Sequence, residues 1–143
     1  MKTQRYLLDT DTFSFVVDGR HPEVRRMVAK MQKAVSISVL TLAEAMFGAR
    51  KKHSPRLESL VAMFSELFPV VSWSEDAAKV YADIRTQLEE SGRPIGDMDM
   101  LIAASAIAGG YVLVTNNVRH FRRIKGLAVE SWVKGMHVNV EGK

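Results

Sequence analysis

The hydrophobic positions of this chain follow two patterns: short apolar runs rich in β-branched residues, and longer stretches in which apolar side chains recur at helical spacing. The short runs are typical of buried strands, and the longer stretches are typical of helices with one apolar face. Strands are predicted at residues 6–8, 35–39, 70–71 and 111–114, with a last apolar stretch around residues 127–132. Helices are predicted at residues 22–33, 40–52, 57–68, 74–88 and 97–108.

The predicted strands and helices alternate along the sequence. Such alternation favours an α/β fold in which a central parallel sheet carries helices on both faces. In that fold the residues that follow the strands gather at the carboxyl edge of the sheet, where functional groups usually lie. Because no repeat or linker divides the chain, we expect a single domain over residues 1–133 and a flexible C-terminal tail over residues 134–143.

Composition narrows the classes of function. A chain of 143 residues has the length of one domain, and its lack of cysteine excludes disulfides, thiolate zinc sites, iron–sulfur clusters and a cysteine nucleophile. The formal net charge of +4 permits a polyanionic partner without requiring one. The N-terminus lacks a secretory signal, and Gly109 and Gly110 interrupt the uncharged stretch Met100–Val118, so we expect a cytoplasmic protein that does not cross a membrane.

Acidic residues stand where the pattern predicts burial or the end of a strand. Asp9 and Asp11 follow the first strand, Glu44 lies in an otherwise apolar helical stretch, and Asp97 and Asp99 open an uncharged helix. Burying a carboxylate is costly unless it is paired, hydrogen-bonded or bound to metal. If the strands lie side by side, these carboxylates converge into an oxygen-rich site suited to Mg²⁺ or Mn²⁺. Such an ion activates water and neutralises charge on a phosphodiester.

The same residues also allow a purely structural interpretation. The aspartates after the first strand and at the start of the helix at 97–108 are well placed to cap helices, and an aspartate taken alone is more often a cap. Glu44 could be a solvated helix residue, and Asn116 with Asn117 could form a turn between a strand and a helix. The recurrence of acids after successive strands favours a shared site, but spacing alone does not prove convergence.

Basic residues form two groups, which run from Arg50 to Arg56 and from Arg119 to Lys125. A charge run of this kind is usually a solvated helix end. Basic groups beside a carboxylate site also fit binding to a phosphate backbone. The histidines lack the paired spacing of metal ligands, so no histidine-based metal site is expected. The candidate RNA contacts are Arg50, Lys51, Arg119 and Arg122.

Three segments resemble, in order, the motifs of a known family. They are YLLDTDTFSF at residues 6–15, SISVLTLAEAMFGARK at residues 36–51 and GRPIGDMDMLIAASAIAGGYVLVTNNVRHFRRIKGLAVESW at residues 92–132. They are similar to the PIN-domain ribonucleases, specifically the VapC toxins of bacterial toxin–antitoxin pairs, over nearly the whole chain. The acid before LIAA, followed by VTNN and then an aromatic residue, is the most specific part of the resemblance.

The resemblance implies a three-layer PIN-like fold and a set of catalytic residues. It makes Asp9, Glu44 and Asp99 the metal-binding acids, and it places Asn117 where many relatives carry a fourth acid. Because an amide binds metal more weakly than a carboxylate does, one ordered ion is expected. Hydrogen bonds that support the carboxylates are expected from Thr10, Ser38, Thr115 and Asn116.

Two positions depart from the family pattern. Asp11 replaces the Asn that usually follows Asp-Thr in the first motif, which adds negative charge to the site. Asp97 stands where close relatives often have Pro, so Asp97 and Asp99 are two candidates for one role. Asp99 is the predicted ligand because it lies immediately before the MLIAA segment.

The resemblance also implies an activity and partners. We expect water activated by Mg²⁺ or Mn²⁺ to cleave a phosphodiester of RNA, with a tRNA-like substrate as an extension of this expectation. The expected protein partners are a VapB-type antitoxin, whose peptide fills the groove and often places Arg among the acids, and a second copy of the chain in a homodimer.

Two other functions fit part of the sequence. Asp9-Thr10-Asp11 after a strand also resembles the first motif of haloacid-dehalogenase phosphatases, and Gly96-Asp97 resembles their last. Phe13 stands where that family has Thr or Val, and Gly96-Asp97 follows a proline loop instead of a strand. The second alternative is a module that binds RNA or a partner protein without cutting, which would show no metal-dependent cleavage.

Overall fold

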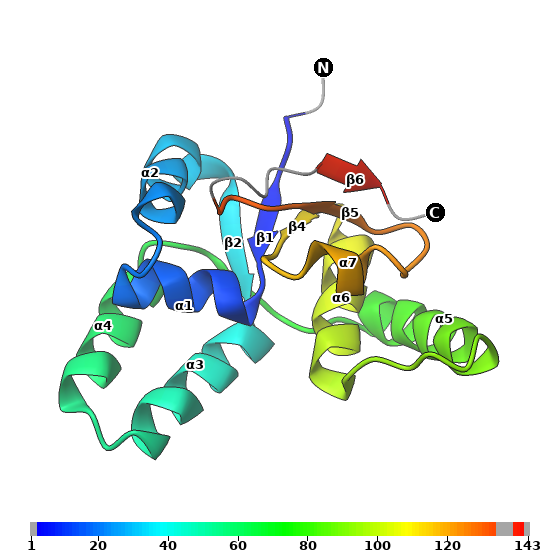
Figure 1. Ribbon diagram of the computed structural model, residues 1–143, viewed down its shortest axis with the longest axis horizontal. Coiled ribbons are helices and arrows are strands. Elements are labelled where there is room, and N and C mark those ends of the chain that lie inside the picture. Colours follow the sequence, from blue (N-terminus) through cyan, green and yellow to red (C-terminus); the bar gives the residue numbers. More distant parts are fainter. Residues whose placement is uncertain (1–2, 134–138, 142–143) are drawn as a thin grey trace.

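The structure, a computed structural model, describes residues 3–133 and 139–141, and in this part of the chain six strands form one central sheet (Figure 1). The strand order is β3-β2-β1-β4-β5-β6. All neighbouring strands are parallel except β5 and β6, which are antiparallel. The strands are β1 (Tyr6–Leu8), β2 (Val35–Ser38), β3 (Val70–Val71), β4 (Val112–Val114), β5 (Ala128–Glu130) and β6 (Asn139–Glu141).

Helices cover both faces of this sheet (Figure 1). Side chains of a strand alternate between its faces, so Leu8 lies in one hydrophobic core and its neighbour Leu7 in the other. The predicted α/β fold in three layers is therefore confirmed. The first core is covered by α1 (Thr10–Asp18), α2 (Pro22–Met31), the 3₁₀ turn η1 (Gln32–Ala34), α3 (Val39–Lys51) and α4 (Pro55–Ser65), and the second by α5 (Glu75–Glu90), α6 (Asp97–Gly109) and α7 (Val118–Phe121).

Short polar side chains set where the helices near the sheet edge begin. Asp9 caps α1, because its Oδ1 accepts a hydrogen bond from the Thr12 N–H at 2.8 Å. Ser38 caps α3 in the same way, with its Oγ accepting from the Leu40 N–H at 3.0 Å. Each cap satisfies a backbone donor that the first turn of a helix leaves free. The first turns of α1 and α3 therefore start directly at the ends of β1 and β2.

The carboxyl ends of three adjacent strands meet at one edge of the sheet. β1 lies in the middle, where Leu8 pairs with Ile37 of β2 on one side and with Val114 of β4 on the other. The Asp9 N–H donates to the Val114 carbonyl oxygen at 2.9 Å and so continues the ladder past the strand. Residues that follow β1, β2 and β4 therefore leave the sheet from neighbouring points, as the sequence predicted.

The C-terminal region is described only in part. Of the flexible tail expected over residues 134–143, only residues 139–141 are described, and they form β6 beside β5. The other residues of that predicted tail lie outside the described part of the chain. The pairing has a simple cause, because an open strand edge offers unpaired backbone groups to a nearby segment. Within the described ranges, none of the helices combines the length and apolar composition that a membrane crossing requires.

Candidate active site

A cavity of ≈ 210 Å³ opens at the carboxyl edge of the sheet. Its walls come from the β1–α1 junction, the middle of α3, the first turn of α6, and the segment from the end of β4 into α7. The structure thus brings together all four residues that were predicted to be catalytic. The lining residues are Asp9, Thr10, Asp11, Glu44, Asp99, Asn117 and Phe121.

Asp9 is the most deeply buried acid of this cavity, with only 5% of its surface exposed. Burial raises the pKa of Asp9 from 3.8 to about 7, because the charged form loses its hydration. Hydrogen bonds from Thr115 and Thr12 lower the pKa of Asp9 and so oppose this rise, whereas the negative charge of Asp11 adds to it. Among the described residues, no Lys or Arg forms an ion pair with Asp9. The carboxylate therefore caps α1 and still lacks a compensating cation.

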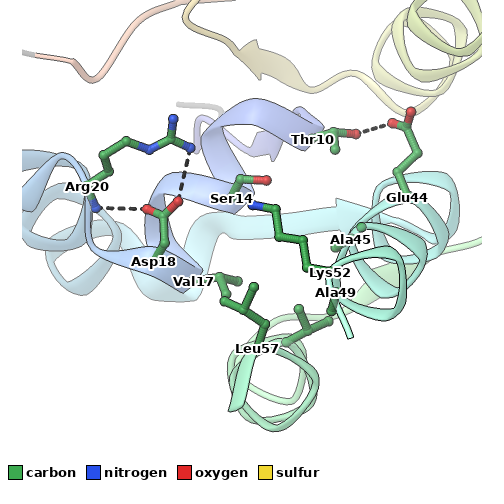
Figure 2. A pocket seen from close by; sticks show the side chains of 12 residues that line it. Thr10, Ser14, Val17, Asp18, Arg20, Glu44, Ala45, Ala49, Lys52 and Leu57 are labelled. Carbon is green, nitrogen blue, oxygen red and sulfur yellow. Dashed lines mark hydrogen bonds and ion pairs between the residues drawn. The ribbon is translucent and has the colours of Figure 1, made fainter. Parts of the chain in front are cut away.

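Glu44 reaches the cavity from α3 and is held by Thr10 of α1. The Thr10 hydroxyl donates a hydrogen bond to Glu44 Oε1 (Figure 2). Thr10 is thus in contact with a carboxylate, as the resemblance implied. The contact directs one Glu44 oxygen toward α1.

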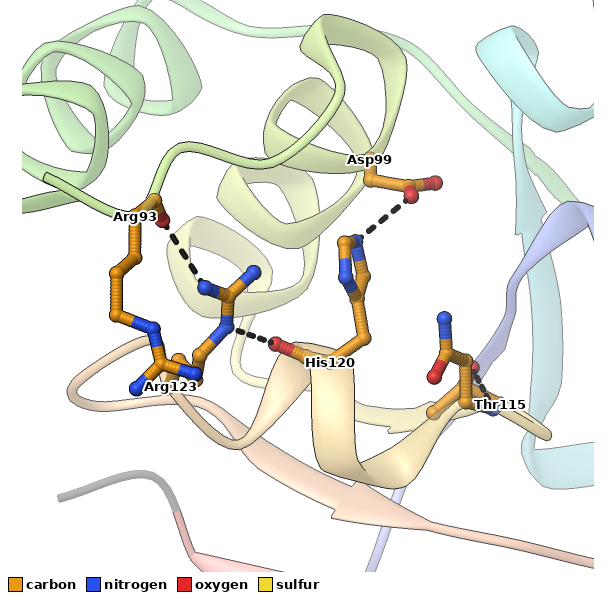
Figure 3. Close-up of polar contacts among 6 residues, drawn as sticks. Arg93, Asp99, Thr115, His120 and Arg123 are labelled. Carbon is orange, nitrogen blue, oxygen red and sulfur yellow. Dashed lines mark hydrogen bonds and ion pairs between the residues drawn. The ribbon is translucent and has the colours of Figure 1, made fainter. Parts of the chain in front are cut away.

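Asp99 enters the cavity from the first turn of α6 and contacts a histidine. His120 Nε2 lies 3.0 Å from Asp99 Oδ2 (Figure 3). The side chains are 22% exposed for His120 and 43% exposed for Asp99. Asp97 is exposed and does not line the cavity, so the position of Asp99 agrees with its choice over Asp97. Asp11, which replaces the Asn of the family pattern, is exposed and also lines the cavity.

The donor atoms of the cavity suit a hard divalent cation, because they are carboxylate and amide oxygens. The buried Asp9 carboxylate, which no described cation neutralises, fits such an ion as well. Among the described residues, however, no three His, Asp or Glu side chains lie close enough together to hold a metal ion. Because Glu44 is turned to Thr10, rotation of the Glu44 side chain would have to accompany the binding of a metal ion.

The residues expected to support the carboxylates behave differently from one another. Thr115 is buried, hydrogen-bonds to Asp9, and accepts from the Asn117 N–H at 3.0 Å through its Oγ1 (Figure 3). Ser38 was predicted to contact a carboxylate, but its hydroxyl caps α3 instead. Asn116 does not line the cavity, and its Oδ1 is buried without a hydrogen-bond partner in the described part of the chain.

The predicted RNA contacts lie outside the cavity at two places. Arg119 is exposed on α7, the helix that also supplies Phe121 to the cavity wall, and Arg122 is exposed directly after this helix. Arg50 and Lys51 are exposed at the end of α3, where Arg50 lies 3.5 Å from Glu58 in an ion pair. Arg119 and Arg122 form no ion pair within the described ranges, so their charges are available to an anion.

A second groove, of ≈ 140 Å³, continues from the cavity between α1, α3 and α4. The two spaces share Thr10 and Glu44 as lining residues. Farther along, the groove is lined by Asp18 and by Lys52, whose side chain extends toward Ser14 (Figure 2). The groove that leads away from the acidic cavity is therefore lined by both acidic and basic groups.

His120 is the site residue that the sequence analysis does not predict, and Phe121 enters that analysis only as the aromatic residue after VTNN, without a place in the site. The histidines lack paired metal-ligand spacing and His120 stands within a basic run, so neither pattern indicates its position beside Asp99. The available signal was helical spacing, because His120 and Phe121 follow Asn117 by one turn of α7.

The fold and the site can be compared with known proteins. The family model described as PIN domain matches residues 6–127 of this chain. The tRNA(fMet)-specific endonuclease VapC of Shigella flexneri is 34% identical over 129 residues, which cover 90% of this chain and 98% of that protein. Ribonuclease VapC2 of Rickettsia felis is 34% identical over 134 residues, with the same coverage of 90% and 98%.

Solved structures that resemble this chain also contain VapC proteins. VapBC2 of Rickettsia felis bound to a DNA fragment from its promoter matches with a TM-score of 0.85 and 31% identity, over 90% of this chain and 99% of that one. DNA-bound VapBC of Salmonella typhimurium matches with a TM-score of 0.86 and 34% identity, over 91% of this chain and 99% of that one.

Proposed function

We propose, because the chain belongs to the VapC ribonucleases of the PIN-domain family, that it is a divalent-metal-dependent endoribonuclease and the toxin of a toxin–antitoxin pair. The observation that carries this proposal is the placement of Asp9, Glu44 and Asp99 on the wall of one cavity. These residues come from distant parts of the sequence, and capping alone does not explain why three carboxylates face the same space.

The proposed reaction is hydrolysis of an RNA phosphodiester. A bound Mg²⁺ or Mn²⁺ ion would supply an activated water and would neutralise negative charge on the phosphate. Asp9, Glu44 and Asp99 would hold that ion, with Asp9 kept in place by its bond to the first turn of α1. Asn117 lines the same cavity, where its amide is able to orient water or a phosphate oxygen.

The substrate class is RNA, and a tRNA is the first substrate to test. The relative from Shigella flexneri is named for cleavage of tRNA(fMet), and the identity of 34% over 129 residues supports trying the same RNA here. The exposed Arg119 and Arg122 beside the cavity favour contact with phosphates along the backbone, which supplies affinity without reading sequence.

The proposed protein partners are a VapB-type antitoxin and a second copy of this chain, and the proposed location is the cytoplasm. The solved relatives from Rickettsia felis and Salmonella typhimurium are VapBC complexes, which supports an antitoxin. Exposed apolar side chains on α3, namely Phe47 at 65% and Met46 at 37%, support burial of this helix in a protein contact. The lack of cysteine suits a reducing compartment.

The phosphatase alternative is wrong. It required Asp97 to act beside Asp9, but Asp97 lies outside the acidic cavity, and the chain belongs to a different family. The non-cleaving binding module remains the competing hypothesis, because it shares the fold and the basic residues with the nuclease.

Induction of the chain in bacterial cells separates these two functions. The wild-type chain and the Asp9→Asn variant are expressed at equal level, and total RNA is recovered and mapped for new ends. The expected result is growth arrest with discrete RNA cleavage for the wild type only, because the variant keeps the helix cap and loses the carboxylate charge. Equal arrest by both chains would contradict the metal-nuclease mechanism and favour the binding module.

A further inference from the structure

A histidine outside the predicted catalytic set is fixed against one of the acids of the cavity. His120 Nε2 lies 3.0 Å from Asp99 Oδ2, within hydrogen-bonding distance (Figure 3). The His120 ring is 22% exposed, and it packs edge to face against Phe121, with 5.2 Å between the ring centroids. The ring is therefore held on two sides, by Asp99 and by a wall residue of the cavity.

A second set of contacts fixes the helix that carries His120 relative to the helix that carries Asp99. Arg123 Nε donates to the His120 carbonyl oxygen at 3.3 Å, and Arg123 Nη1 donates to the Arg93 carbonyl oxygen at 3.0 Å (Figure 3). Arg93 lies in the loop that leads into α6. Gln87 of α5 adds a third hydrogen bond, in which its Nε2 donates to the Arg123 carbonyl oxygen at 3.0 Å. These bonds hold α7 against the segment from which Asp99 projects.

The two oxygens of the Asp99 carboxylate have different surroundings. Oδ2 faces the His120 ring, whereas Oδ1 points away from it (Figure 3). A carboxylate fixed through one oxygen presents the other in a set direction, which is how hydrogen bonds behind a metal ligand usually act. The contact needs only an N–H at Nε2, which imidazole carries in one neutral tautomer as well as in the charged form.

We propose that His120 is a positioning residue that orients Asp99 toward the metal ion, an inference that rests on the proposed function. His120 does not line the cavity, so it acts through Asp99 and does not touch RNA or the reacting atoms. Arg123 supports this arrangement through its hydrogen bonds to the His120 and Arg93 carbonyl oxygens.

The test measures metal binding and catalysis separately. His120→Ala removes the N–H donor, and His120→Gln returns a donor on a side chain of similar reach. His21→Ala is the matched control, because His21 also faces a carboxylate, that of Glu23 at 3.9 Å, and does not line the cavity. Mn²⁺ affinity is measured by titration calorimetry, and kcat and KM for RNA are measured at saturating metal. Thermal melting of each variant checks that it is folded.

We expect His120→Ala to weaken Mn²⁺ binding by about 10- to 100-fold and to lower kcat with little change in KM for RNA. His120→Gln should recover most of the metal affinity, and His21→Ala should match the wild type. Unchanged Mn²⁺ affinity in a folded His120→Ala variant would overturn the inference. A rise in KM with unchanged metal affinity would also overturn it, because His120 would then contact RNA directly. A wild-type chain that neither binds Mn²⁺ nor cleaves RNA would instead overturn the proposed function, and this inference with it.

Discussion

The Thr10 hydroxyl donates a hydrogen bond to Glu44 Oε1 across the gap between α1 and α3. This bond occupies one of the acids that the metal needs, and in this arrangement no three described acids or histidines lie close enough to hold an ion. Metal binding and the Thr10–Glu44 contact therefore compete for the same carboxylate. Breaking a hydrogen bond of this kind costs about 1 kcal/mol.

Removal of the Thr10 hydroxyl should release Glu44. We predict that Thr10→Val strengthens Mn²⁺ binding by about 3- to 10-fold, because the cost of breaking the bond disappears. Thr10→Ser keeps the hydroxyl and should bind Mn²⁺ like the wild type, so the pair of variants isolates the hydrogen bond. Titration calorimetry gives both affinities. Weaker binding by Thr10→Val alone would mean that the hydroxyl supports the metal-bound arrangement.

The buried carboxyl of Asp9 should make stability depend on pH. Its pKa is raised from 3.8 to about 7, so between these values the folded chain holds a proton that the unfolded chain releases. The contribution of Asp9 to the free energy of unfolding without metal is therefore highest below pH 4, falls as the pH rises toward 7, and is level above it. From pH 5 to pH 8 the fall should be about 2 to 3 kcal/mol.

Asp9→Asn provides the comparison for that fall, because the amide cannot ionise and still caps α1. Denaturant unfolding of both chains in a metal chelator, at pH 5 and pH 8, measures the difference between them. All other titrating groups are common to the two chains and cancel. Equal pH dependence in both chains would show that burial does not penalise the charge of Asp9.

Metal affinity should also depend on pH because the pKa of Asp9 is raised. It should increase with pH over the range in which the contribution of Asp9 to the free energy of unfolding decreases. Asp9 must lose its proton before it binds a cation, and with a pKa of about 7 it is mostly protonated at pH 6. We predict that Mn²⁺ affinity rises by about 10-fold from pH 6 to pH 8. At pH 6 binding should release about one proton, which calorimetry in buffers of different ionisation enthalpy detects. Binding without proton release would exclude Asp9 as a ligand with a raised pKa.

The exposed Arg119 and Arg122 should contribute to RNA binding more than Arg50 does. Arg119 and Arg122 form no ion pair in the described part of the chain, whereas Arg50 is paired with Glu58. In an Asp99→Asn background that leaves RNA intact, Arg119→Ala and Arg122→Ala should each weaken binding and reduce the slope of log affinity against log salt by about 1.

The controls for that comparison are Arg50→Ala and Lys79→Ala. Lys79 is exposed on α5 and should have no effect on the salt slope, while Arg50→Ala should have a smaller effect than Arg119→Ala or Arg122→Ala. Fluorescence anisotropy over a series of salt concentrations measures all four slopes. A larger effect of Arg50→Ala would place the RNA along α3 instead of α7.

The gathering of the acids was predictable because it depends on topology. Once β1, β2 and β4 are parallel neighbours, Asp9 and Asn117 must emerge at the same edge, and α3 begins at that edge too. The capping interpretation of Asp9 was also correct, and it does not compete with the site. One oxygen of Asp9 accepts from the Thr12 N–H, which fixes the carboxylate beside the cavity.

The contacts around those acids were not predictable in the same way. Whether Glu44 turns to Thr10, or Asp99 to His120, depends on how α1 packs on α3 and how α7 packs on α6. Hydrophobic periodicity predicts that such helices pack, but it does not give the rotation that brings two polar side chains together. Ser38 illustrates the limit, since the hydroxyl has a nearby backbone donor to satisfy and takes it in preference to a carboxylate.

We propose that Asp99, with Asp9 and Glu44, forms the metal site that cleaves RNA. The most direct test of this site is cleavage of tRNA(fMet) and total RNA by purified wild-type chain, Asp99→Asn and Asp97→Asn, each with Mg²⁺ or with a chelator. Asp97 is exposed and lies outside the cavity two residues from Asp99, so it controls for the loss of one negative charge. We predict cleavage by the wild type and Asp97→Asn only with Mg²⁺, and none by Asp99→Asn. Cleavage by Asp99→Asn at the wild-type rate, or cleavage that persists in the chelator, would contradict the account.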